Sequence, residues 1–143
     1  LIQDQNNHIL KNNKLKLMTS RKPSLSEIND IIFASCICKY VNSNAIVIAK
    51  NLTSLGIGTG QTNRIEAVEQ AIAKMKKNGI KTKDLVLSSD GFFPFDDVVS
   101  LCKDNSISAI LQPGGSRNDQ KVIDSCEKNN ISLLFSGIRL FKH

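Results

Sequence analysis

The sequence predicts an α/β domain built as αβα layers, because short apolar runs alternate with helical patterns along its second half. Apolar runs at 85–88, 107–111 and 131–135 are typical of buried strands, and the segments at 97–103 and 119–128 favour helices. Short links between such elements imply parallel strands joined by right-handed crossovers. We therefore expect the functional loops to gather at one edge of the sheet, where the parallel strands end.

The first helix is predicted by the run Ser24-Leu25-Ser26-Glu27, which has the form of a capping box. We expect this helix to extend to about Tyr40 and to bury one face. The residues expected near that face are Ile28, Ile31, Ile32 and Cys36. Before the helix, two short extended stretches are expected at 1–3 and 15–18, around a polar turn.

Two strands and a second helix should follow. The run 45–49 is continuously apolar, and residues 51–52 favour a turn into another strand at 53–57. The segment 63–78 predicts a helix that ends at Gly79 as its C′ residue. Its core stripe is expected to consist of Ile65, Val68, Ile72 and Met75.

Length and composition indicate one globular domain. The chain has 143 residues, of which 41% are hydrophobic and 22% charged, and its net charge is +6. It has no apolar run long enough for a bilayer, no signal-peptide pattern and no initiator Met, so we expect a fragment of a longer chain. The basic residues near its start have no aromatic neighbours, which favours a solvated surface over a nucleic-acid interface. We expect neither nucleic acid nor membrane as a partner, although a mildly positive field would suit a phosphate-bearing substrate.

Cysteine and histidine usage argues against a metal site. The four cysteines form no CxxC pair, and the only histidines are His8 and His143. We expect free, mostly buried thiols in a reducing cytosol, which indicates a cytoplasmic protein. The cysteines are Cys36, Cys38, Cys102 and Cys126. No Ser/His/Asp or Cys/His constellation can be assembled from these residues, so the chain offers no obvious acid–base pair.

The most unusual stretch is the run from 88 to 97, Ser-Ser-Asp-Gly-Phe-Phe-Pro-Phe-Asp-Asp. Pro94 fixes its own φ and holds Phe93 in an extended conformation, so this run should form a stiff loop. Its aromatic residues, Phe92, Phe93 and Phe95, follow a predicted strand. A rigid, aromatic and acidic loop at a strand end suits the binding of a flat heterocycle.

Two glycine-rich loops precede predicted helices. The spacing Gly56-x-Gly58-x-Gly60 fails the dinucleotide fingerprint, because Gln61 stands where the third glycine should be. Such glycines would still let the backbone approach a ligand, beside a helix N-terminus that attracts anions. Arg64, in the first turn of the helix predicted at 63–78, is either a surface charge or a guanidinium that forms a pair of hydrogen bonds with a phosphate or carboxylate. The second loop, at 114–116, is either a plain tight turn or a binding loop.

Four other polar residues are candidates for a site. Asn44 either braces the start of its strand or uses its amide on a carboxamide substrate. Asp97 is expected to cap the helix that it opens. Arg139 and His143 lie beyond the last strand, which suggests that the tail packs back over a site.

Together these stretches resemble the AICAR transformylase part of the bifunctional purine biosynthesis protein family. The family pattern is close to SNA, GIGAGQxxR, SDAFFPFRD, QPGGS and RxFxH, and five ordered motifs are specific where one alone would be weak. The matching motifs are Ser43-Asn44-Ala45, Gly56 to Arg64, Ser88 to Asp97, Gln112 to Ser116 and Arg139 to His143. The match covers most of residues 21–143.

The resemblance implies a formyltransferase of purine (IMP) biosynthesis. It would transfer a formyl group from 10-formyltetrahydrofolate to the amino group of AICAR, an aminoimidazole carboxamide ribonucleotide, giving formyl-AICAR and tetrahydrofolate. The implied fold is a duplicated cytidine deaminase-like domain without zinc. Residues 23–143 would form its C-terminal half, and residues 1–22 the trailing part of the preceding transformylase segment. The sequence has neither the family's catalytic Lys-His segment nor the IMP cyclohydrolase domain, so we expect no catalytic residue here and no activity from this chain alone.

The resemblance also implies two sets of binding residues. The AICAR-binding set is Asn44, Arg64, Phe92 and Arg139. The folate-binding set is Ile65, Asp97, Ser116 and Arg117. The family further implies a homodimer with its site at the interface. It implies no tightly bound cofactor beyond the folate co-substrate, with a monovalent cation as a further candidate ligand.

Three departures from the family pattern concern the loops. Asp96 stands where the family usually has Arg, which reverses a charge beside Asp97. Gly91 and Thr59 each replace an Ala and are milder changes.

The alternative to a part of a formyltransferase is that the chain is a stand-alone or remnant nucleotide-binding module without catalysis.

Overall fold

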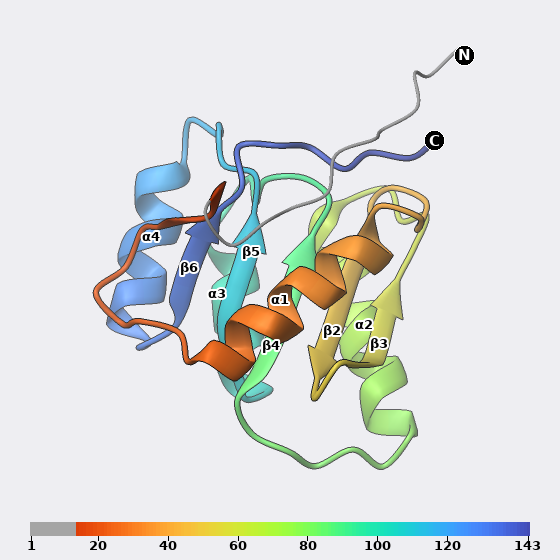
Figure 1. Ribbon diagram of the computed structural model, residues 1–143. Coiled ribbons are helices and arrows are strands. Elements are labelled where there is room, and N and C mark those ends of the chain that lie inside the picture. Colours follow the sequence, from red (N-terminus) through yellow and green to blue (C-terminus); the bar gives the residue numbers. More distant parts are fainter. Residues whose placement is uncertain (1–13) are drawn as a thin grey trace.

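The computed structural model describes residues 14–143, so the extended stretch expected at 1–3 lies outside the described residues. Strands and helices alternate along the described part of the chain (Figure 1). In chain order they are β1 (Lys16–Leu17), α1 (Leu25–Cys38), β2 (Ile46–Lys50), β3 (Thr53–Gly58), α2 (Arg64–Lys77), β4 (Leu85–Ser89), α3 (Asp97–Asp104), β5 (Ile107–Gln112), α4 (Asp119–Lys128) and β6 (Ser132–Phe135).

One sheet runs through the domain in the order β1-β6-β5-β4-β2-β3. Strands β4, β5 and β6 are parallel, whereas β2 is antiparallel to both of its neighbours and β1 is antiparallel to β6. Helix α1 lies on one face of the sheet, and α2, α3 and α4 lie on the other (Figure 1). The αβα architecture and the parallel arrangement of the last three strands are therefore confirmed.

The two faces of the sheet carry separate apolar cores, as alternation along a strand requires. On β2, Ile46 and Ile48 belong to the core beneath α2, α3 and α4, whereas Val47 and Ala49 belong to the core beneath α1. The helix-side residues Val68, Ile72 and Met75 are buried as predicted, but Ile65 is only partly buried. The domain is thus held together from both sides of β2, β4 and β5.

Helix α1 begins as predicted. The Ser24 hydroxyl accepts a hydrogen bond from the Glu27 amide (3.2 Å), and the Glu27 carboxylate accepts one from the Ser24 amide (2.7 Å). The buried face of the helix is nevertheless rotated from the expected one. It includes Ile31, Ala34 and Cys38, spaced by three and four residues. The prediction for Cys36 is wrong, because this position falls on the far side of the helix and is exposed.

The remaining thiols behave as expected. All four cysteines are free, and Cys38, Cys102 and Cys126 are buried. Burial raises the pKa of all three thiols, that of Cys126 to about 12, so they stay protonated and unreactive. Within residues 14–143, no three His, Cys, Asp or Glu side chains gather as a metal ion would need. The same residues include no helix that is long and apolar enough to cross a membrane.

Candidate functional site

The loops that carry most of the predicted site residues meet at one edge of the sheet, the upper edge in Figure 1. Backbone hydrogen bonds join them in pairs. The Asn44 amide donates to the Gln61 carbonyl (3.2 Å), and the Ser43 amide donates to the Lys142 carbonyl (2.9 Å). The Leu140 amide donates to the Asp90 carbonyl (2.9 Å). The C-terminal tail therefore packs back over the strand ends, as the sequence suggested.

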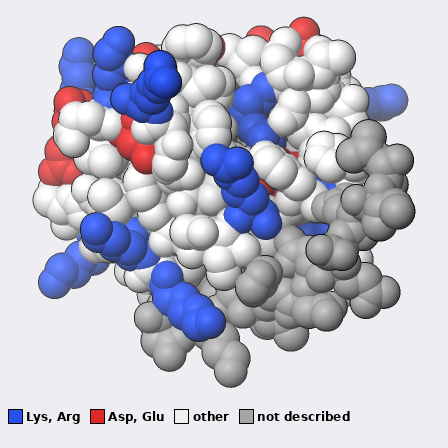
Figure 2. Space-filling view, turned by 90° about the horizontal axis from the view of Figure 1, so that it is seen from above, with Lys and Arg blue, Asp and Glu red and all other residues white. Residues whose placement is uncertain are grey.

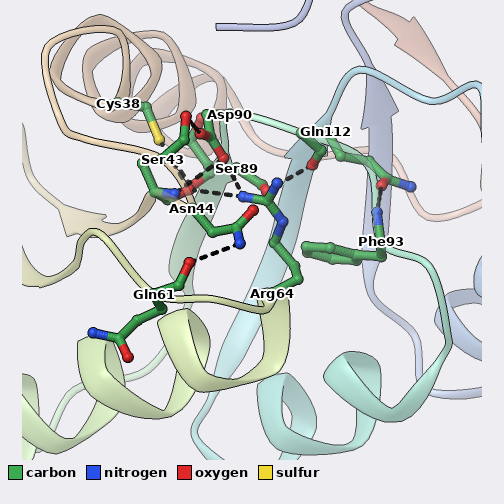
Figure 3. A network of polar contacts seen from close by, with 12 residues as sticks. Cys38, Ser43, Asn44, Gln61, Arg64, Ser89, Asp90, Phe93 and Gln112 are labelled. Carbon is green, nitrogen blue, oxygen red and sulfur yellow. Dashed lines mark hydrogen bonds and ion pairs between the residues drawn. The ribbon is translucent and has the colours of Figure 1, made fainter. Parts of the chain in front are cut away.

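Asp90, directly after β4, is the centre of this edge (Figure 3). Its side chain is fully buried, and its carboxylate accepts hydrogen bonds from the Ser43 hydroxyl, the Ala45 amide (3.1 Å) and the Arg64 guanidinium. Sequence reasoning missed this residue, because its residue type does not distinguish Asp90 from the two carboxylates that follow in the run 88–97. The one signal that sets it apart is its position directly after a strand that begins with three apolar residues.

Arg64 is a buried ion-pair partner and not a surface charge. Its side chain is only 7% exposed, and its Nη1 also donates to the Ala45 carbonyl (3.5 Å). The carboxylate that it binds is the chain's own Asp90. Among the residues that the structure describes, its buried Nε has no hydrogen-bond partner. A buried donor without a partner costs free energy, which an acceptor on a ligand would recover.

The other three residues of the AICAR set lie around the same centre. Asn44 stands between two residues that bind Asp90, and its Nδ2 donates to the Gln61 carbonyl (2.8 Å). Phe92 follows Asp90 by two positions, and the Arg139 guanidinium lies 5.3 Å from the centre of its ring. The structure thus brings all four residues to one edge of the sheet.

A pocket of about 280 Å³ lies beside Arg64, between the start of α2 and the loop before α3. It is lined by Asn63, Arg64, Ile65, Pro94, Phe95, Asp97 and Val98. Two residues of the folate set, Ile65 and Asp97, therefore meet in one cavity. Asp97 is the first residue of α3 and not its cap, because Asp96 occupies the N-cap position. The prediction that Asp97 caps this helix is wrong by one position.

The other two residues of the folate set, Ser116 and Arg117, do not line this pocket. The amides of Gly115 (2.7 Å) and Ser116 (3.1 Å) donate to the carboxylate of Asp119 in the first turn of α4. These donors are already satisfied inside the chain, as in a self-capped turn. One link reaches the pocket, because Asn118 Nδ2 donates to the Pro94 carbonyl (2.7 Å).

The three phenylalanines of the loop have different environments. Phe93 is fully buried in the core, Phe92 is half-buried, and Phe95 is 60% exposed. The interpretation of all three as a surface for a heterocycle is therefore wrong for Phe93. Its amide donates to Gln112 Oε1 (2.5 Å), and Gln112 itself is fully buried. Sequence reasoning did not predict that Gln112 holds this loop in place. The available signal was a polar residue at the end of an otherwise apolar strand.

The first two glycines of the 56–60 loop serve packing and not ligand approach. A Cβ added at Gly56 or Gly58 would collide with the carbonyl oxygen of Ala71 or Ala67 on α2. Their missing side chains let α2 lie directly on β3. Gly60 has open space around it but a positive φ of +64°, a backbone conformation that favours glycine. Of the three glycines, Gly60 is therefore the one that the turn itself requires.

The upper edge of the molecule is seen from above in Figure 2. Lys and Arg side chains are spread over this face, whereas most of the Asp and Glu side chains that it shows lie along the left and upper margins of the view.

Two hollows that are larger than the pocket beside Arg64 lie elsewhere on the molecule. One of about 510 Å³ lies at the end of α2 around Met75 and Leu85, and one of about 710 Å³ lies between α3 and α4. Asp96 lines the second hollow together with Lys103 and Lys121, so it points away from the smaller pocket beside Arg64.

Solved structures with the same architecture define the fold class. A diaminohydroxyphosphoribosylaminopyrimidine deaminase/5-amino-6-(5-phosphoribosylamino)uracil reductase from Thermotoga maritima has a TM-score of 0.52 and 18% identity, covering 76% of this chain and 34% of that one. A dCMP deaminase from the cyanophage S-TIM5 has a TM-score of 0.53 and 15% identity, covering 75% of this chain and 94% of that one. The chain therefore has a cytidine deaminase-like fold, as the resemblance implied.

Sequence comparison gives the family. The family model described as AICARFT/IMPCHase bienzyme matches residues 1–74. The chain is 50% identical over its whole length to the bifunctional purine biosynthesis protein PurH of Fusobacterium nucleatum, and 48% and 42% identical to those of a Thermoanaerobacter species and Aquifex aeolicus. The chain therefore belongs to the AICARFT/IMPCHase bienzyme family. It spans 28% of the length of each of these relatives.

Proposed function

We propose that the chain is the C-terminal, nucleotide-binding part of an AICAR transformylase and serves purine biosynthesis. The observation that carries this proposal is the cluster around Asp90, which unites Asn44, Arg64, Phe92 and Arg139 beside a pocket lined by Ile65 and Asp97. The family name covers a second activity, that of an IMP cyclohydrolase. The deaminase-like fold and the residue matches favour the transformylase part.

Each group has a defined task in this proposal. Arg64 offers its unpaired Nε to an acceptor on the nucleotide, and the Arg139–Phe92 stack gives a flat, positively charged wall beside it. Asp97 can accept hydrogen bonds from the donor edge of a pterin in the 280 Å³ pocket. These groups bind and orient the two substrates, 10-formyltetrahydrofolate and AICAR.

The proton of the attacking amino group must leave as the new carbon–nitrogen bond forms. In this chain the described part contains one histidine, His143, whose ring lies 6.0 Å from that of Phe141 in the tail. We assign proton transfer to the Lys-His segment that the family has outside this chain. A homodimer, a monovalent cation, the absence of a tightly bound cofactor and a cytoplasmic location belong to the same proposal.

A chimera tests the assignment. In the Fusobacterium relative, the matching segment is replaced by this chain, and formyl-AICAR formation and ring closure to IMP are measured separately. We expect formyl transfer to be retained, and Arg64→Ala in the chimera to reduce it while leaving ring closure unchanged. A loss confined to ring closure would refute the transformylase assignment.

The isolated chain tests the missing base and the alternative function. We expect the purified 143-residue chain to bind AICAR but to transfer no formyl group, because general acid–base help is typically worth about 10²–10⁴-fold in rate. Transfer at a rate near that of a full-length relative would contradict this. A chain that binds AICAR, while its chimera stays inactive, would instead support the remnant nucleotide-binding module.

A further inference from the structure

We propose that Asp90 is a positioning residue that sets the arrangement of the AICAR-binding residues, an inference that rests on the function proposed above. Asp90 contacts three segments that are far apart in the sequence, and each segment carries or adjoins a residue of the AICAR set. Ser43 and Ala45 flank Asn44, Arg64 is bound directly, and Leu140 follows Arg139.

Every hydrogen-bonding group of Asp90 takes part in this arrangement. Oδ1 accepts from the Ala45 amide and from Arg64, and Oδ2 accepts from the Ser43 hydroxyl. Its own amide donates to the Ala45 carbonyl (3.2 Å), and its carbonyl accepts from Leu140. The Ser43 hydroxyl accepts in turn from the Lys142 amide (3.2 Å), which carries the connection into the tail.

The charge of Asp90 determines where the Arg64 guanidinium rests. Asp90 is fully buried and Arg64 nearly so, in surroundings where charge-assisted hydrogen bonds are strong. Asp90 engages Nη1, whereas the buried Nε of the same side chain has no partner among the described residues, and Arg64 lines the 280 Å³ pocket. Without that carboxylate, a buried guanidinium would turn toward water and carry its remaining donors away from the pocket.

Asp30 provides a matched control. It is also a buried carboxylate, and it accepts hydrogen bonds from the amides of Asn51 (3.0 Å) and Leu52 (2.7 Å) at the β2–β3 turn. Neither Asn51 nor Leu52 belongs to a predicted binding set. Asp30→Asn should therefore lower stability in the same manner as Asp90→Asn, without touching the candidate site.

The experiment compares AICAR affinity by calorimetry with backbone hydrogen exchange in the 143-residue chain. For Asp90→Asn we expect about tenfold weaker binding or more, and faster exchange at 43–45 and 140–142. For Asp30→Asn we expect unchanged affinity, with faster exchange confined to 50–53. In an Arg64→Ala background, adding Asp90→Asn should weaken binding little further, because the two residues act as a unit.

The outcomes separate this inference from the proposed function. If the wild-type chain binds no AICAR, the proposed function fails for this chain, and hydrogen exchange alone decides the role of Asp90. Unchanged exchange at both segments, or unchanged affinity in Asp90→Asn, would overturn the inference. If Asp90→Asn does not fold, Ser43→Ala replaces it. That variant removes only the hydroxyl link, and it should weaken AICAR binding about threefold or more if the inference holds, and not at all if it fails.

Discussion

Glu27 and Asp90 are both buried carboxylates that bind an arginine, a serine hydroxyl and a backbone amide, yet only one lies in a candidate site. Glu27 ties the start of α1 to β5 and β6, through Arg21 (2.9 Å) and the hydroxyl of Ser108. Asp90 does the same at the other end of the sheet, for the 43–45 segment, α2 and the tail.

The difference lies in the arginines. Arg21 also donates from Nη1 to the Ser108 carbonyl (3.1 Å) and the Ser132 hydroxyl (2.6 Å), so it binds three groups from two strands and the helix. Arg64 leaves its buried Nε unpaired within the described residues and lines a pocket. Arg21 therefore links secondary-structure elements to one another, whereas Arg64 keeps a buried donor that an acceptor on a ligand could satisfy, as the proposed function requires.

The largest expected effect comes from removing Arg64. Arg64→Ala leaves the buried Asp90 carboxylate unpaired, so we expect a loss of about 3–5 kcal/mol in the free energy of unfolding. Denaturant unfolding measures that loss, and calorimetry should show weaker AICAR binding. Arg21→Ala is the matched variant, and it should lower stability without changing AICAR affinity. Equal losses of affinity in the two variants would abolish the distinction between the clusters.

Removing Arg139 should affect binding more than stability. In a full-length protein that contains this chain, we expect Arg139→Ala to weaken AICAR binding by about 1.5–3 kcal/mol, because a charged hydrogen bond from the guanidinium to AICAR would be lost. Lys142→Ala is the control, since Lys142 is an exposed cation of the same tail whose Nζ donates to the Tyr40 carbonyl (3.1 Å). Unchanged affinity in Arg139→Ala would leave this residue as a structural charge over Phe92.

The Glu27 cluster should make stability depend on pH. Burial opposes ionisation of Glu27, but hydrogen bonds from Ser108, the Ser24 amide and Arg21 together hold its pKa below the ordinary value of 4.5. Because the pKa is lowered by folding, the stabilisation is present above pH 4.5 and is lost as the pH falls through the folded-state pKa. Thermal unfolding between about pH 6 and 3 should show a smaller acid-induced decrease for Glu27→Gln than for wild type. An identical decrease in both would mean that other carboxylates dominate.

The smallest effect is expected at Asp96. This residue is exposed and lines the hollow between α3 and α4, so solvent screens its charge. Because Asp96 points away from the 280 Å³ pocket, we expect Asp96→Arg in the chimera to leave the Michaelis constant for the folate unchanged to within about twofold. The dependence of that constant on salt should be unchanged as well. A lower constant, most of all at low salt where screening is weak, would show that the glutamate carboxylates of the folate extend past Asp96.

Local patterns in the sequence predicted the elements well. The apolar runs and the capping box gave β4, β5, β6 and α1 to within about two residues, because a strand or helix is determined by its own periodicity. The rotation of α1 was missed, since Ile28, Ile32 and Cys36 are apolar on a helix that is apolar around most of its surface.

The centre of the site could not be predicted in the same way. The partners of Asp90 come from positions 43, 45, 64 and 140, and no local pattern announces such contacts. Gly56 and Gly58 were assigned to ligand approach, because a bare backbone looks the same in sequence whether a ligand or a helix lies against it. The family resemblance supplied residues that spacing alone left open, such as Asn44 and Arg139.

The position of Asp90 between early and late segments has a consequence for how the chain is made. Its partners Ser43 and Ala45 leave the ribosome before Asp90 does, but Leu140 leaves it well after Asp90. The pairing of β1 with β6 joins Lys16 to Phe135 and has the same requirement. Nascent chains that stop before residue 132 can form the β2–β3 hairpin, but β5 then lacks its pairing with β6. Such chains should remain sensitive to proteases until β6 and the tail have emerged.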